Sequence, residues 1–279
     1  MRPLAVWCLA LCASVVTAVM AGEGPGLSLR GDWQQGAVLQ GRVPPGTEVW
    51  FNGRALRLST EGDFIFGLDR DAPEEAELRI RYAGEAVPQT YRYPVARRQY
   101  DIQRLDGLPP AMVTPPPEVQ ARIREDQALA AAARQRDSLL TGFAESFAWP
   151  CLGRISGVFG SQRILNGVPK QPHYGVDVAV PTGTEVRAPA SGVVSLARDD
   201  MYYTGGTLML DHGHGLASTF LHLSKLLVRE GQAVRQGEVI ALSGATGRAT
   251  GPHLDWRMSW FDARIDAQRL VPPMETQRR

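Results

Sequence analysis

The sequence contains few cysteines, and they are unevenly placed. Two of the three, Cys8 and Cys12, lie in the apolar N-terminal run, and the third is Cys151. A chain that keeps only Cys151 cannot form an internal disulfide, so a disulfide-stapled fold is excluded. Cys151 has no neighbours in the sequence that would stabilise a thiolate, and we interpret it as a small buried hydrophobe rather than a nucleophile.

An excess of charge of one sign is also absent. The 30 Lys and Arg residues nearly balance the 29 Asp and Glu residues, the net charge is +1, and no basic block occurs. Nucleic-acid binding is therefore excluded, because it needs a basic stripe or patch. The length of 279 residues and the hydrophobic fraction of 44% are typical of a globular chain of two modest domains.

Only the N-terminus carries a long apolar run. Arg2 is followed by the apolar residues 4–20 and by the small residue Ala21, an order typical of a cleaved secretory signal. We predict a signal peptide over 1–21 and export to the periplasm or cell envelope, with no membrane span after cleavage. An uncleaved membrane anchor, or a lipoprotein anchored at Cys8 or Cys12, is the less favoured alternative.

The N-terminal half predicts a β module joined to a helix. Residues 22–100 contain short alternating segments and the hairpin signal Asn52-Gly53, which together predict a small, Ig-like β-sandwich. Residues 101–117 are rich in proline and predict a stiff linker. Residues 118–148 contain no proline and include the alanine-rich run 128–133, a composition that predicts a connecting α-helix.

The remaining residues return to a β pattern. Short strands alternate with glycine-bearing turns over 149–272, which predicts an antiparallel β domain, and 273–279 form a tail. This domain holds all five histidines. His212 and His214 lie in a turn with two glycines, where a structural or solvent-facing role is expected.

The other three histidines and two aspartates are candidates for a metal site. His173 precedes Asp177 by four residues, His222 lies in a Leu-His-Leu-Ser stretch, and His253 is two residues before Asp255. Residues two apart in a strand face the same way, so His253 and Asp255 can both enter one cleft. Zinc takes ligands of both types. Spacing alone does not distinguish these residues from structural histidines.

The motifs also resemble those of a known family. His173-x3-Asp177, the stretch around His222, and Thr250-Gly251-Pro252-His253 occur in the order found in lysostaphin/LytM-type peptidoglycan endopeptidases, which have the duplicated hybrid motif fold. The resemblance covers about 149–272. It implies that His173 and Asp177 are zinc ligands and that His222 and His253 are catalytic.

The sequence departs from this family at the last ligand. The family ends its site with His-x-His, whose second histidine binds the metal, and Asp255 stands at that position here. By resemblance the ligands are therefore His173, Asp177 and Asp255. Two carboxylates would neutralise a divalent ion, so we expect a less acidic bound water and stronger competition from Mn²⁺.

The resulting hypothesis is a zinc metalloendopeptidase that hydrolyses amide bonds in the peptide stems or cross-links of peptidoglycan. The alternative is a catalytically inactive LytM-like regulator that binds and activates other envelope hydrolases, because Asp255 replaces the usual histidine. A biotinyl or lipoyl carrier fits less well, since neither Lys170 nor Lys225 lies at the tip of a hairpin.

Overall fold

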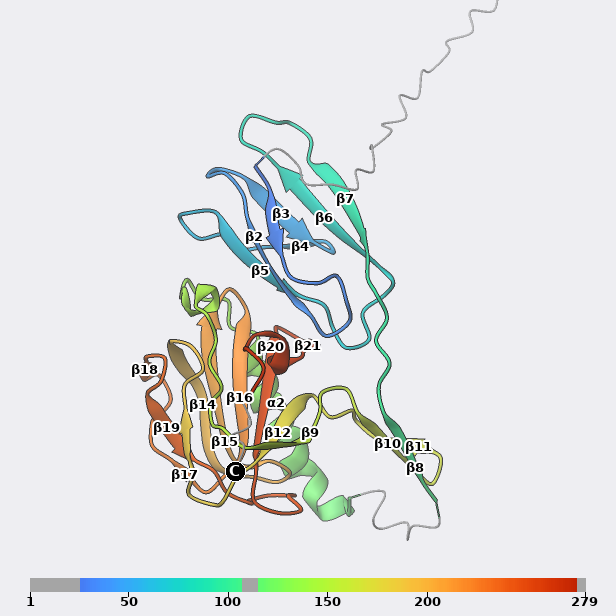
Figure 1. Ribbon diagram of the computed structural model, residues 1–279, viewed down its shortest axis with the longest axis vertical. Coiled ribbons are helices and arrows are strands. Elements are labelled where there is room, and N and C mark those ends of the chain that lie inside the picture. Colours follow the sequence, from blue (N-terminus) through green and yellow to red (C-terminus); the bar gives the residue numbers. More distant parts are fainter. Residues whose placement is uncertain (1–25, 107–114, 275–279) are drawn as a thin grey trace, which may run out of the picture.

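The computed structural model describes residues 26–106 and 115–274. The chain is mainly β, with an N-terminal module, a connecting helix and a C-terminal β domain, so the predicted fold class is confirmed (Figure 1). The signal peptide predicted for 1–21 lies outside the described residues. No helix in the described ranges is long and apolar enough to cross a membrane.

The N-terminal module consists of two small antiparallel sheets. One contains β4 (Arg54–Ala55), β3 (Glu48–Phe51), β6 (Glu75–Arg81) and β7 (Gln89–Pro94), in that order. The other contains β1 (Ser28–Arg30), β2 (Val38–Arg42) and β5 (Asp63–Gly67). Buried and part-exposed residues alternate along β6, as expected for a strand with one face on a core. The rings of Phe51 and Phe66, one from each sheet, stack 4.2 Å apart and join the two sheets.

The C-terminal domain is built on one large antiparallel sheet. Its strands are, in spatial order, β18 (Ala233–Val234), β14 (Gly192–Met201), β15 (Gly205–Gly213), β16 (Leu216–Leu223), β20 (Leu254–Trp260), β12 (Gly175–Ala179) and β9 (Arg154–Gly157). β21 (Ala263–Ile265) pairs with β20 and leads into the short 3-10 helix η3 (Ala267–Arg269). A smaller sheet contains β13 (Glu185–Arg187), β19 (Val239–Leu242) and β17 (Lys225–Leu226).

The helix lies against this large sheet. The 3-10 turn η1 (Pro117–Val119) leads into α2 (Gln120–Arg134), whose Ala133 packs in one cluster with Met209 of β15. The neighbouring residues Leu208 and Leu210 belong to the main core instead, because successive side chains of a strand face opposite ways. The helix is shorter than the expected 118–148. After Arg134 the chain is irregular, with a single 3-10 turn η2 (Gly142–Ala144).

The predicted linker contains a strand that the sequence did not indicate. β8 (Ile102–Leu105) pairs in parallel with β10 (Gln162–Leu165), and β10 pairs with β11 (Val168–Pro169) across a turn. These three strands extend to one side of the C-terminal domain (Figure 1). Parallel pairing between residues about 60 positions apart depends on tertiary structure, which the proline-rich composition does not reveal.

The module packs on the C-terminal end of β20. Phe51 contacts Trp260 edge-on with ring centres 5.8 Å apart, and the Arg54 guanidinium lies 4.0 Å from the centre of the Phe261 ring. The backbone N–H of Arg264 donates to Asp69 at 2.7 Å. β20 rises about 3.4 Å per residue, so this contact lies roughly 17 Å along the strand from Asp255.

His212 and His214 are core residues. The His212 side chain is fully buried, with Nδ1 2.9 Å from the Ser191 carbonyl oxygen and Nε2 2.7 Å from the Ser218 hydroxyl. The His214 ring is buried against Phe143 at a centroid distance of 4.1 Å. Burial lowers the pKa of His212 to about 4, so this histidine is neutral in the folded protein at pH 7.

This neutral histidine makes stability depend on pH. Between pH 4 and 6.5 the unfolded chain binds a proton at His212 that the folded chain does not, so stability is lost as the pH falls through this window. The shift corresponds to about 3 kcal/mol. We expect a His212→Gln variant to lose less stability than the natural protein when urea unfolding at pH 7 is compared with pH 4.5. Equal losses in both proteins would contradict this assignment.

Candidate metal centre

Two carboxylates face each other across neighbouring strands. β12 and β20 are antiparallel, and Asp177 lies directly opposite Asp255 in their register. The side chain of Asp255 is 2% exposed and that of Asp177 is 22% exposed. Like charges directly opposite each other destabilise a sheet, so this pair requires positive charge nearby.

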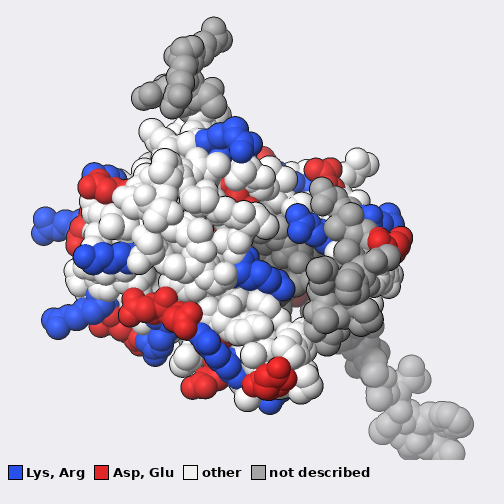
Figure 2. Space-filling model, turned by 90° about the horizontal axis from the view of Figure 1, so that it is seen from below, with Lys and Arg blue, Asp and Glu red and all other residues white. Residues whose placement is uncertain are grey.

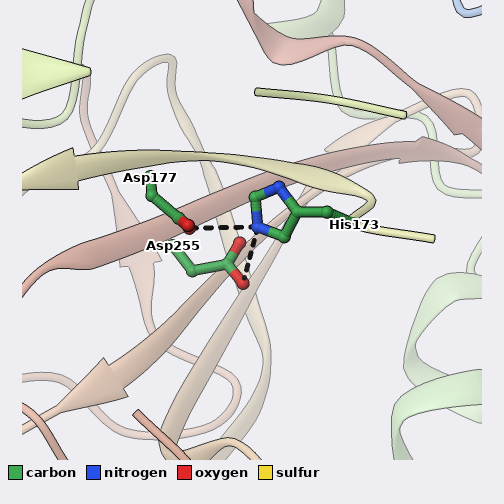
Figure 3. Close-up of side chains that lie close together, drawn as sticks. All are labelled: His173, Asp177 and Asp255. Carbon is green, nitrogen blue, oxygen red and sulfur yellow. Dashed lines mark ion pairs between the residues drawn. The ribbon is translucent and has the colours of Figure 1, made fainter. Parts of the chain in front are cut away.

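His173 supplies a nitrogen to the same point. Its Nε2 lies 3.0 Å from Oδ1 of Asp177 and 3.5 Å from Oδ2 of Asp255, and all three side chains converge from the loop before β12, from β12 and from β20 (Figure 3). Backbone bonds hold the loop on both sides: His173 N–H donates to Ser161, and Gly160 N–H donates to the His173 carbonyl, each at 2.7 Å.

The tautomer of His173 is fixed by its other ring nitrogen. Nδ1 lies 3.2 Å from the carbonyl oxygen of Val158. A carbonyl can only accept a hydrogen bond, so the contact requires the hydrogen on Nδ1. In the neutral ring Nε2 is then bare and faces the carboxylates, as in histidines that bind metals.

These donors fit a divalent ion. His173 Nε2 and Asp177 Oδ1 are buried and make no hydrogen bond, although they lie 3.0 Å apart. One ligand atom from each of His173, Asp177 and Asp255 can be chosen so that all lie within 4.8 Å of one another. Atoms that share a zinc ion at about 2.0–2.2 Å each lie ~3–4 Å apart, so one nitrogen and two carboxylate oxygens form a suitable set.

Two glycines leave room for the carboxylates. Gly157 on β9 lies opposite Asp177, and a Cβ there would be 2.2 Å from Oδ2 of Asp177. Gly175 on β12 leaves room for the other carboxylate, because a Cβ there would be 2.3 Å from Oδ1 of Asp255. Any larger residue at either position would displace a candidate ligand.

The charges of the site are strongly coupled. Burial lowers the pKa of His173, but the carboxylates of Asp177 and then Asp255 outweigh burial and raise it to about 10. Burial would raise the pKa of Asp255, but the charge of Arg257 and contact with His173 hold it well below its usual range. Without an ion, the protonated His173 supplies the positive charge between the carboxylates.

Arg257 is a site residue that sequence reasoning missed. Its Nη2 donates to Asp255 Oδ2 at 2.6 Å, and its Nε lies 3.0 Å from Oδ1 and 3.1 Å from Oδ2. The signal was present, because a residue two positions after Asp255 in a strand lies on the same face. The expectation that two carboxylates neutralise a divalent ion is therefore incomplete, since Arg257 offsets one of them.

His222 and His253 form the adjacent wall of the site. Their ring centres are 4.8 Å apart, and His253 Nε2 lies 3.8 Å from Asp177 Oδ1. Each Nδ1 lies 2.8 Å from a carbonyl oxygen, that of Thr246 for His222 and that of Gly251 for His253, which again leaves Nε2 bare in the neutral ring.

The backbone and the surroundings of His222 set its properties. It has a φ of +62°, a left-handed conformation that is uncommon for residues other than glycine. Burial lowers the pKa of His222, so its ring is neutral near pH 7. The structure thus brings together all five residues singled out in the sequence.

Comparison with known proteins identifies the family. Residues 171–267 match the model of peptidase family M23. A crystal structure of a Pseudomonas aeruginosa protein assigned to peptidase M23 is 30% identical to this chain, with a TM-score of 0.65, and the match covers 85% of this chain and 94% of that one. This chain belongs to peptidase family M23. The length of the match shows that the N-terminal module is part of the shared architecture.

Curated M23 proteins resemble the C-terminal domain. The peptidoglycan DD-endopeptidase ShyA of Vibrio cholerae is 42% identical over 123 residues, which are 43% of this chain and 28% of that protein. The DD-carboxypeptidase/endopeptidase Mpg of Neisseria meningitidis is 43% identical over 100 residues, 36% of this chain and 22% of that protein. This chain therefore spans under a third of the length of each of these two relatives.

The geometry predicts one divalent ion per chain. We expect the purified protein to bind one equivalent of Zn²⁺ and the His173→Ala variant, which removes the only nitrogen ligand of the three, to bind it at least about tenfold more weakly. Isothermal titration calorimetry measures both. The His212→Gln variant is the matched control, because it alters a histidine outside the site, and an equal loss of zinc in this control would refute the assignment.

Proposed function

We propose that this M23 protein is a metal-dependent endopeptidase that hydrolyses amide bonds in the peptide stems or cross-links of peptidoglycan, in the periplasm or cell envelope. The observation that carries the proposal is the convergence of His173, Asp177 and Asp255 beside His222 and His253, with His173 Nε2 and Asp177 Oδ1 buried and without a hydrogen-bond partner. The relatives support the substrate class, since ShyA is named a peptidoglycan DD-endopeptidase and Mpg a DD-carboxypeptidase/endopeptidase.

His173, Asp177 and Asp255 would hold the ion, which we propose to be zinc, with Mn²⁺ as a competitor. A divalent ion in such a site polarises the scissile carbonyl and activates a water molecule. The protein contributes the fixed positions of the three side chains, which β12, β20 and the loop before β12 determine.

His222 and His253 would handle protons and orient the substrate. His222 is suited to accept a proton, because burial keeps its ring neutral near pH 7 and its Nδ1 is held by the Thr246 carbonyl. His253, whose Nε2 lies 3.8 Å from Asp177 Oδ1, would donate a hydrogen bond to the oxygen of the peptide carbonyl once its Nε2 carries a proton, as negative charge develops on that oxygen. In each ring Nδ1 is held by a backbone carbonyl, so Nε2 is the atom that gains or donates the proton.

The surface is consistent with a neutral or mixed-charge substrate. The face seen from below in Figure 2 carries basic and acidic side chains interspersed around a broad area without charge. A protein that binds nucleic acid would present a uniformly basic stripe, which this face lacks. The helix α2 packs on β14 and β15. The module packs on the end of β20 and, through Arg70, on the carbonyl of Gly160, whose N–H holds the His173 loop. We propose that both support the catalytic domain.

Cleavage of purified peptidoglycan tests the proposal. We expect the protein to release peptide fragments that mass spectrometry identifies, to lose this activity in EDTA and to regain it when Zn²⁺ is added. A protein that binds no ion and releases no fragments would instead be the non-catalytic regulator considered from the sequence. Activity that persists in EDTA would contradict the metal-dependent mechanism.

The roles of the two further histidines are tested separately. We expect His222→Ala and His253→Ala each to lower kcat by about a hundredfold or more, as removal of a proton-transfer group does, while zinc affinity changes little. Fragment release over time and calorimetry measure the two effects. Loss of zinc binding in either variant would show that the histidine acts as a ligand and not as a catalytic residue.

A further inference from the structure

The carboxylate of Asp255 is bound on one side before any ion arrives. Arg257 contacts both of its oxygens, and the Asp255 side chain is 2% exposed while that of Arg257 is 25% exposed. We propose that Asp255 and Arg257 act as one net-neutral ligand unit that replaces a neutral third ligand and sets the preference of the site for Zn²⁺ over harder cations. This inference rests on the proposed function, with Arg257 as a positioning residue.

The geometry leaves one side of Asp255 for the ion. An ionised carboxylate offers about four lone-pair positions on its two oxygens. Arg257 occupies part of these positions, with its guanidinium donating to both oxygens. Oδ2 also faces the shared point, 3.5 Å from His173 Nε2. Asp255 can therefore give one oxygen to an ion while the guanidinium holds its orientation.

The strand opposite confines the pair. Gly175 is the register partner of Arg257, and a Cβ at this glycine would lie 2.3 Å from Asp255 Oδ1 and 2.7 Å from Arg257 Cγ. The pair thus fills the space beside β12, and neither member can turn toward that strand. Because the pair is confined in this way, Asp255 would bind the ion through one oxygen only.

The charge of the unit matches that of a neutral ligand. Asp177 and Asp255 each carry one negative charge, and the positive charge of Arg257 cancels that of its partner. The site then presents the same net charge to an ion as one carboxylate with two neutral imidazoles would. Oxygen-rich, strongly negative sites favour harder cations such as Mn²⁺, whereas this compensated site favours zinc.

Substitution of Arg257 therefore changes selectivity. In Arg257→Met both oxygens and the full charge of Asp255 become available, so we expect the ratio of the Mn²⁺ to the Zn²⁺ dissociation constant to fall at least about tenfold, within the range found for partners of metal ligands. Arg257→Lys keeps the charge but not the two-pronged contact, and its ratio should change less. Competition with a fluorescent chelator measures both constants.

Substitution of Asp255 tests whether the two residues act together. Asp255→His leaves the Arg257 cation unpaired beside the ion, and we expect zinc binding at least about tenfold weaker than in the natural protein. In the double variant Asp255→His with Arg257→Met no charge is left unpaired, and zinc affinity should return to within about threefold of the natural value. Arg198→Met is the matched control, since Arg198 is a strand arginine paired with the distant Glu230.

The outcomes separate the inference from the proposed function. An unchanged selectivity in Arg257→Met, or equal zinc affinity of Asp255→His with and without Arg257, overturns the ligand unit. Natural protein that binds no zinc at all overturns the proposed function instead. Circular dichroism confirms that each variant is folded, and the double variant, which buries no unpaired charge, keeps the test valid if a single variant unfolds.

Discussion

The repulsion between Asp177 and Asp255 is the constraint around which the site is built. The two carboxylates are register partners on β12 and β20, and one of them is almost fully buried. Several features offset this repulsion. His173 brings a nitrogen close to both carboxylates, Arg257 donates hydrogen bonds to Asp255, and glycines on β9 and β12 leave space for the two side chains. A divalent ion at the shared point would satisfy both carboxylates and the bare nitrogen together.

The rest of the fold keeps these residues in place. β20 belongs to a sheet whose central strands are buried over most of their length, and its far end carries Trp260 and Phe261 into the contact with the N-terminal module. One strand thus links the candidate metal ligand to the module. Hydrogen bonds from Nδ1 to backbone carbonyl oxygens set the ring orientation of all three site histidines, so the site depends on loop conformation as well as on strand register.

The sequence predicted the fold class correctly, and the five residues that it singled out lie together in the structure. Both could be read without tertiary contacts, because the ordered motifs and the family resemblance lie in the sequence itself. It missed one contact between near neighbours and one pairing between segments distant in the chain. Arg257 looks like an ordinary strand arginine until its partner Asp255 is recognised as a ligand. β8 lies in a segment whose composition predicted a linker, and its pairing could not be predicted because its partner strand is about 60 residues away in the chain. The expected helix was too long, because composition does not mark the end of α2 at Arg134.

A crystal structure of the zinc-loaded protein tests the central claim most directly. The account predicts one ion with His173 Nε2 and one oxygen each of Asp177 and Asp255 at about 2.0–2.2 Å, with Arg257 still bound to Asp255. An ion bound elsewhere, or an Asp255 that stays paired with Arg257 and does not touch the ion, would contradict it.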